Sequence, residues 1–409
     1  MASRRHDLQR EMQHVSSSDS PVRAIPIGGL TFLASLGTGV LWNALYFIAE
    51  SEYGFSEQQS MLLAFLNGIL YTVVAVNAGR TVRFLERRMP PRSALRVILL
   101  VQALLAPLVL VPSEALLWVT AITMTAFGAL QWPIVQHYLA SGRHGTEMRS
   151  AIGWWNASWM AATAIGLAAA GPLAQAGLMK WAIPSLLPIN LLALVFLAKF
   201  PAHPTKHDHE EGARHVPSSY RALLGAARVL HPMGYLVIGA LSPILPYLFN
   251  NLATAPAMQA PIGSTWHLAR LAAVLVLWKT AFWHGRAASL VTAGLLLSLG
   301  FATAIAAPNE WVLIIGLTAL GLGQGAIYYS AIYYGLAVGK AEIDAGGVHE
   351  ALVGAGYFVG PLLGLLTLGV GAGPSVFIGL VLGVLAVGFV VAVVRAGRAS
   401  SQSTASGST

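Results

Sequence analysis

The sequence predicts an all-α polytopic membrane protein, and two features of its composition support this fold class. Of its 409 residues, 56% are hydrophobic and only 10% are charged, whereas a soluble domain has about 25% charged residues. The hydrophobic residues form long runs, each near the ~20 residues that a helix needs to cross a membrane. The composition therefore excludes a soluble enzyme, a disordered chain and, since the chain has no cysteine, a disulfide-rich secreted protein.

Twelve hydrophobic segments follow one another along the chain, six before and six after the polar stretch 201–228. Proline, histidine and charged residues predict that this stretch is a solvated linker. The other connections are short, so neighbouring helices are expected to run antiparallel. The predicted domains are an N-terminal tail (1–26), two six-helix bundles (27–200 and 229–394), the linker and a C-terminal tail (395–409). The predicted helices are 27–49, 57–79, 93–112, 115–140, 151–176, 181–200, 229–254, 260–283, 287–307, 311–337, 348–371 and 374–394.

The positions of the basic residues predict the orientation of the chain. If the N-terminus lies in the cytoplasm, all but two of the 24 Lys and Arg residues lie on the cytoplasmic side, the exceptions being Lys180 and Arg270. An excess of Lys and Arg is typical of cytoplasmic loops. Membrane orientation thus explains the net charge of +8, and we predict no nucleic-acid partner because no basic face with interleaved aromatics is present. Both termini are expected in the cytoplasm, and the short loops and cysteine-free chain favour a bacterial inner membrane.

Two sequence patterns resemble those of a known family. The segment from Gly79 to Arg88, GRTVRFLERR, follows the second predicted helix, and Gly356, Gly360, Pro361 and Gly364 form a Gly-x-x-x-Gly-Pro-x-x-Gly pattern in the eleventh. With the six-plus-six division, they make the chain similar to the major facilitator superfamily, although Arg83 stands near the place where the family has an acid. The resemblance implies two bundles with a substrate site between them near the middle of the membrane. Taken alone, the glycines predict close helix packing.

Arg270 is the one basic residue expected deep inside a predicted helix. It lies about ten residues into the eighth segment, which is ~15 Å along a helix. A charge at that depth is costly, so we expect the guanidinium to face a water-filled cavity and to bind negative charge or carbonyl groups. His267 lies one turn earlier on the same helix face. The alternative is a structural arginine that pairs with a neighbouring helix.

Other polar residues lie at similar depths. In the family, the first, fourth, seventh and tenth helices line the cavity, so the resemblance implies that Asn43, Gln131 and Gln324 bind substrate. Tyr328 lies one turn from Gln324, and Trp132 is adjacent to Gln131. Amide groups beside aromatic rings suit a small polar organic solute. The alternative for each amide is a hydrogen bond between helices, which is common in membranes.

None of the sixteen Asp and Glu residues is expected at the centre of a predicted helix. A coupling proton would therefore need Glu350, His267 or His137, whereas facilitated diffusion needs no such group, and the sequence leaves both open. In the family, the loop after the second helix meets the start of the eleventh. We therefore predict that Arg80 or Arg83 pairs with Glu350 and closes the inner side; the alternative is a solvated acid at a helix N-terminus.

These observations predict a secondary active or facilitative transporter of a small polar organic solute by alternating access. Arg270 favours an anionic or carbonyl-bearing solute. A sugar or multidrug transporter of the same fold is one alternative, and a non-transporting membrane receptor is another from a different class. We expect no enzymatic activity and no cofactor, because no catalytic cluster or phosphate-binding loop is present. The spacing of the linker histidines matches no metal-binding motif, so no metal site is predicted.

Overall fold

The computed structural model describes residues 21–143, 145–205, 218–338 and 343–406. Within these ranges it has twelve helical spans that are long and apolar enough to cross a membrane. The predicted all-α polytopic fold with two six-helix bundles is confirmed. Most of the predicted N-terminal tail and the centre of the linker, with His207, His209 and His215, lie outside the described residues.

The first six spans form the N-terminal bundle. The first, third, fifth and sixth spans are each built from two or more consecutive helical pieces, whereas the second and fourth are continuous. Its helices are α2 (Ala24–Gly39), η1 (Val40–Ala44), α3 (Leu45–Tyr53), α4 (Glu57–Val76), the short connecting α5 (Ala78–Glu86), α6 (Pro91–Leu105), η2 (Ala106–Leu110), α7 (Glu114–Ala140), α8 (Gly145–Ala168), α9 (Ala170–Gln175), η3 (Met179–Trp181) and α10 (Leu186–Leu197).

The last six spans form the C-terminal bundle, in which the seventh and eighth spans are interrupted and the other four are continuous. Its helices are α11 (Ser218–Leu241), η4 (Ser242–Ile244), α12 (Leu245–Asn251), α13 (Pro256–Gly263), α14 (Thr265–Lys279), α15 (Ala287–Ile305), α16 (Glu310–Val338), α17 (Ile343–Gly369) and α18 (Pro374–Ser406).

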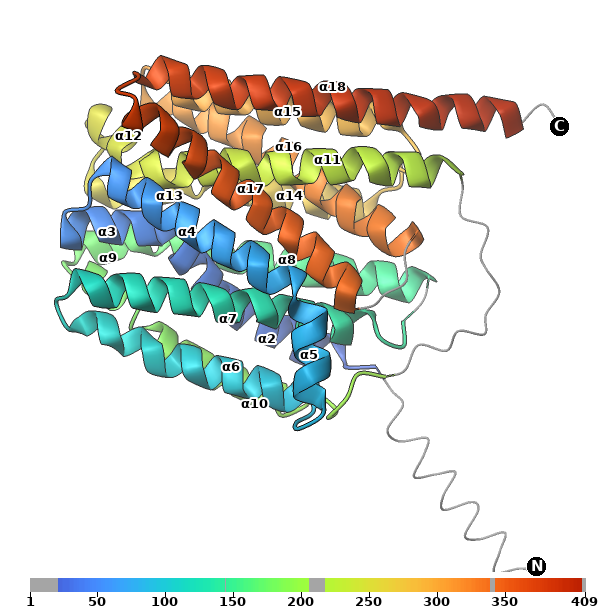
Figure 1. Cartoon of the computed structure of the whole chain (residues 1–409), viewed down its shortest axis with the longest axis horizontal. Helices are drawn as coiled ribbons and strands as arrows, with labels where there is room; N and C mark the ends of the chain where they lie inside the picture. Colours follow the sequence, from blue (N-terminus) through green and yellow to red (C-terminus); the bar gives the residue numbers. More distant parts are fainter. Residues whose placement is uncertain (1–20, 144, 206–217, 339–342, 407–409) are drawn as a thin grey trace, which may run out of the picture.

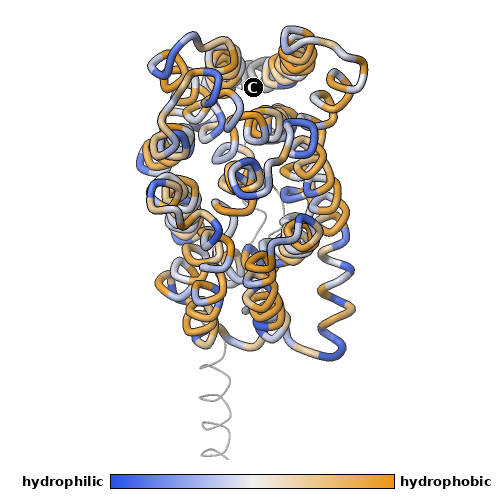
Figure 2. The backbone as a smooth tube through the Cα atoms, turned by 90° about the vertical axis from the view of Figure 1, so that its left-hand side faces the viewer, coloured by the Kyte–Doolittle hydropathy of each residue, from blue (hydrophilic) through white to orange (hydrophobic). Residues whose placement is uncertain are grey.

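The membrane-spanning helices lie side by side and run in roughly one common direction, whereas the short α5 lies across it (Figure 1). We call the side on which α2 begins and α18 ends the terminal side, at the right of Figure 1, and the opposite side the far side. Hydrophobic residues cover most of the helices, and hydrophilic residues gather near helix ends and loops (Figure 2). The helices satisfy their own backbone hydrogen bonds, as a chain surrounded by lipid must. Exposed apolar side chains such as Leu104, Leu299 and Val387 are suited to contact with the lipid tails.

Several helix boundaries differ from the predicted ones, and α18 runs to Ser406 rather than ending at 394. α11 begins at Ser218, so the seventh span extends into the predicted linker 201–228. The eighth span runs from Pro256 to Lys279 rather than from 260 to 283, and it is interrupted at Ser264 between α13 and α14. The predicted segment extended too far because apolar residues follow Lys279, and in the structure these residues form a turn.

Glycines allow several helices to approach one another closely. A Cβ atom on Gly356 or Gly360 of α17 would lie within 2.4 Å of a backbone oxygen of α11. One on Gly68 of α4 would lie 2.5 Å from the backbone nitrogen of Phe358 on α17. α17 is thus held against both its own bundle and the other one, as expected of small residues at membrane helix interfaces.

The first span contains one wider turn. Val40–Ala44 forms a π-helical turn between two α-helical segments, and Trp42 and Asn43 lie within it. Such turns are rare and occur often at functional sites. The turn lies beside the interface with the seventh span, whose own break falls at Ser242–Ile244.

We predict that Gly360→Ala destabilises the protein, because the added methyl group meets the backbone of Leu236 and Ala240. Overpacking of this kind costs about 1–3 kcal/mol, which should lower the melting temperature of the detergent-solubilised protein. Gly379→Ala on α18 is the matched control, since a methyl group added there would have no neighbouring atom within 4 Å. Equal melting temperatures for the two variants would contradict the packing described for α17.

Candidate substrate-binding site

A cavity with about 590 Å³ of empty space lies between the two bundles. The N-terminal bundle contributes residues from the first, second, fourth and fifth spans, and the C-terminal bundle from the seventh, eighth, tenth and eleventh. The lining residues are Ser35, Thr38, Trp42, Asn43, Tyr71, Trp132, Trp155, Trp159, Thr163, Tyr235, His267, Arg270, Tyr328, Glu350, Val353 and Tyr357.

Among the described residues, Arg270 is the one arginine or lysine whose head group lines this cavity, and its side chain is only 2% exposed. Its carbon Cζ lies 4.4 Å from the ring centre of Trp159 and 4.8 Å from that of Trp266. Nη2 donates a 3.3 Å hydrogen bond to Oγ1 of Thr163 and lies 3.0 Å from Nδ1 of His267. Two aromatic faces and two hydrogen-bonding groups therefore hold the cation.

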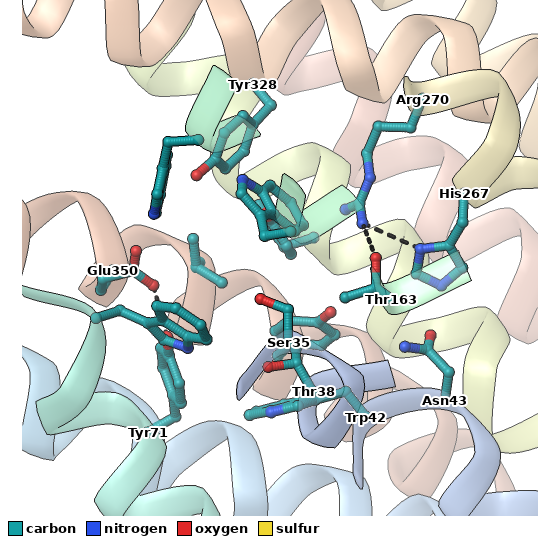
Figure 3. A pocket seen from close by; sticks show the side chains of 16 residues that line it. Ser35, Thr38, Trp42, Asn43, Tyr71, Thr163, His267, Arg270, Tyr328 and Glu350 are labelled. Carbon is teal, nitrogen blue, oxygen red and sulfur yellow. Dashed lines mark hydrogen bonds between the residues drawn. The ribbon is translucent and has the colours of Figure 1, made fainter. Parts of the chain in front are cut away.

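Arg270 has no acidic partner in the described part of the chain. The ion pair found there joins Arg143 to Glu147, and Nε of Arg270 is buried without a hydrogen-bond partner. Figure 3 shows the guanidinium at the cavity, with Thr163 and His267 beside it. A buried charge is costly unless it is paired, so the site is suited to receive a negatively charged or carbonyl oxygen.

The fifth span positions the groups around Arg270. Oδ1 of Asn156 accepts a 2.8 Å hydrogen bond from the indole nitrogen of Trp159, and its amide nitrogen donates to the carbonyl of Ile152. The hydroxyl of Thr163 donates to the carbonyl of Met160 at 3.0 Å, which leaves its lone pairs toward Arg270. Asn156 therefore has a packing role that fixes the ring on which the cation lies.

Glu350 also lines the cavity and is 6% exposed. Its Oε2 accepts a 2.5 Å hydrogen bond from the hydroxyl of Tyr71, and its Oε1 accepts one of 2.5 Å from the amide nitrogen of Gln136. Both donors belong to the N-terminal bundle, whereas Glu350 lies on α17. The carboxyl group thus links the two bundles through neutral partners.

Five of the predicted binding residues line the cavity: Arg270, His267, Asn43, Trp132 and Tyr328. Gln131 is buried and instead lines a smaller neighbouring cavity within the N-terminal bundle, together with Gln102 and Asn190. Gln324 is buried against Gly234 of α11 and does not line the central cavity. The adjacent Trp132 lines both cavities, so it lies between the central cavity and the smaller one that Gln131 lines.

Sequence reasoning missed most of the aromatic wall. Tyr71, Tyr235 and Tyr357 line the cavity, but tyrosines are common in membrane helices and carry no pattern of their own. Trp159 was recognisable as a deep tryptophan in the segment GWWNASW, at 153–159. Its place beside Arg270 depends on how α8 packs against α14, which a single sequence does not reveal.

A second cavity, of about 770 Å³, lies toward the terminal side between α7 and the seventh, tenth and eleventh spans. Gln136 and His349 line it, whereas Glu350 lines the central cavity. The hydrogen bond from Gln136 to Glu350 therefore lies between the two cavities. Arg80 and Arg83 lie exposed on α5, and the described partners of Glu350 are Tyr71 and Gln136 rather than these arginines.

The far side is closed by contacts between the first two and the seventh spans. The hydroxyl of Tyr247 on α12 donates to the carbonyl of Phe55 at 2.7 Å and lies 3.1 Å from the hydroxyl of Ser60. The amide of Asn250 donates to Glu50 at 3.2 Å. These bonds join the two bundles on the side opposite to the second cavity.

The comparison with protein families gives the family that the fold suggests. The model described as Major Facilitator Superfamily matches residues 27–238, which is half of the chain. The chain belongs to the Major Facilitator Superfamily. Its members are transporters, so the protein is a multi-pass membrane transporter that acts on a small-molecule solute.

A solved structure gives the same fold. The human organic anion transporter MFSD10 (TETRAN) superposes with a TM-score of 0.65 at 14% sequence identity, covering 91% of this chain and 98% of that chain. At this identity the likeness shows the fold alone. A comparison with curated protein sequences finds no match.

We predict that Thr163→Val lowers the stability of the protein, because it removes the oxygen that accepts a hydrogen bond from Arg270. A hydrogen bond to a charged group contributes about 1.5–3 kcal/mol. Thermal unfolding in detergent should show a lower melting temperature for this variant, and Thr163→Ser, which keeps the hydroxyl, should stay close to the wild type. A valine variant as stable as the serine variant would contradict the role given to this oxygen.

Proposed function

We propose that this transporter moves a small organic solute with an acidic or carbonyl group across the membrane by alternating access. The observation that carries the proposal is Arg270, a buried cation that lines the cavity between the bundles and has no acidic partner in the described chain. An anionic group bound there would supply the missing charge, in a low-dielectric site where charge-assisted hydrogen bonds are strong.

The contacts that join the bundles on one side and the cavity on the other support alternating access. Tyr247 and Asn250 join the bundles on the far side, while a cavity lies toward the terminal side. In this family fold, rocking of two bundles around a central site exposes it to each side in turn. The bonds of Glu350 to Tyr71 and Gln136 lie where an inner gate would act, and pairing of Glu350 with Arg80 or Arg83 stays a prediction for another conformation.

We also propose that the terminal side is cytoplasmic and that the membrane is a bacterial inner membrane. The helices α5 and α6 and the turn between them carry six arginines between positions 80 and 96 on the terminal side, and such an excess is typical of cytoplasmic loops. The residues flanking the far ends of the spans carry Lys180 as their one lysine and no arginine.

An anionic solute is favoured over a sugar because a sugar would leave Arg270 without a counter-charge, even though neutral groups such as Ser35 and Asn43 are available to its hydroxyls. The solved structure of the same fold whose title names an organic anion transporter agrees with this choice. A multidrug transporter would also use the aromatic rings of the cavity, but a drug without an acidic group would leave Arg270 without a partner.

We predict that Arg270→Gln lowers uptake of small carboxylates into proteoliposomes by about tenfold or more, since one charge-assisted hydrogen bond contributes about 1.5–3 kcal/mol. Arg270→Lys, which keeps the charge without the planar fork, should retain part of the uptake. The measurement compares aliphatic and aromatic carboxylates with their uncharged amides.

Arg286→Gln is the matched control, because Arg286 is an exposed arginine of the same bundle away from the cavity. Its uptake should equal that of the wild type. Unchanged carboxylate uptake by a folded Arg270→Gln variant would overturn the proposed function, and a protein that binds carboxylates but never moves them would be a receptor.

A further inference from the structure

Glu350 gives the cavity a second charged pole. The carboxyl group lines the same cavity as Arg270, and in the described part of the chain no lysine, arginine or histidine pairs with it. Both of its oxygens accept hydrogen bonds, one from Tyr71 and one from Gln136. An ionised carboxylate accepts hydrogen bonds on both oxygens, and the two bonds of Glu350 fit this form. The negative charge of such a carboxylate has no cation beside it.

Aromatic rings surround the approach to this pole. The ring centre of Trp42 lies 5.3 Å from that of Tyr71 and 4.2 Å from that of Tyr357, and all three residues line the cavity. The faces of such rings attract ammonium groups, most strongly where water is excluded. Tyr71 therefore both donates to Glu350 and belongs to an aromatic cluster suited to a cation.

The two poles face one cavity from different sides. Figure 3 shows Glu350 and Tyr71 on one side of the cavity and Arg270 and His267 on the other. A solute with only an acidic group would satisfy Arg270 but leave the carboxylate of Glu350 buried without a counter-charge, which is unfavourable. A solute with a basic nitrogen as well would satisfy both.

We propose that the solute is a zwitterion, with its acidic group at Arg270, its protonated nitrogen at Glu350 and an apolar or aromatic body against the rings between them. This inference rests on the proposed function, since it keeps Arg270 as the anion site. It adds that Glu350 determines specificity through contact with the solute, in addition to linking the bundles.

Matched compounds test the inference on the full chain in lipid nanodiscs. Each set has one body, either phenyl or indolyl, and three forms: the amino acid (L-phenylalanine or L-tryptophan), the acid without the amine, and the amine without the acid. The amino acid should bind at least about tenfold more tightly than the acid in one or both sets, which corresponds to about 1.4 kcal/mol. The amine alone should bind most weakly, because it leaves Arg270 unpaired.

Glu350→Gln keeps the shape of the side chain and removes its charge. It should abolish the preference for the amino acid over the acid while leaving binding of the acid equal or stronger. Glu52→Gln, at an exposed acid near the far end of the first span, is the control and should keep the preference. Melting temperatures establish that each variant is folded.

The results separate this inference from the proposed function. If acids bind in an Arg270-dependent manner but the amine adds no affinity, the anion transporter stands and the zwitterion inference is overturned. The inference is also overturned if neither amino acid binds. It is overturned as well if Glu350→Gln removes proton movement during uptake of the acid but leaves the preference for the amino acid unchanged, because the carboxyl group of Glu350 then carries a proton instead of binding the solute. If acids bind to the Arg270→Gln variant as tightly as to the wild type, the proposed function itself is overturned.

Discussion

The position of the Arg270 guanidinium is the constraint on which the site depends. Moving such a cation out of water costs several kcal/mol even after the protein relaxes. The structure offsets that cost with two tryptophan faces, a hydroxyl and an imidazole. Trp159 and Thr163 belong to one bundle, whereas Arg270 and Trp266 belong to the other. The cation therefore joins the two bundles at the cavity. Any motion that separates α8 from α14 breaks the contacts of the guanidinium with Trp159 and Thr163, and another group must then replace them.

The fold was predictable because its physical causes lie along the chain. Runs of apolar residues fix the number of spans, and the one long polar stretch divides them six and six. The helix ends were less predictable, as the early start of α11 at Ser218 shows. Apolar content marks what can lie in a membrane, but it does not mark where a helix stops when the flanking residues are themselves good helix formers.

The site was most predictable where a residue was out of place. Arg270 stood out because a charge inside an apolar run needs a reason, and His267 followed from helical spacing. Gln324 was placed by analogy between helices, and the packing of α16 turns it toward α11 instead. Glu350 looked like an acid at a helix end, but close contact between α17 and α4 buries it at the cavity. Such burial results from tertiary packing, which composition and spacing do not contain.

The π-helical turn at Val40–Ala44 has a consequence for the shape of the cavity wall. In a regular α-helix, neighbouring residues point about 100° apart. The wider turn reduces that angle, and both Trp42 and Asn43 face the cavity. One inserted residue thus gives the first span an aromatic ring and an amide at the same height in the membrane. Removing a residue from this turn would rotate the far end of the span, with its closing contacts, relative to the wall of the cavity.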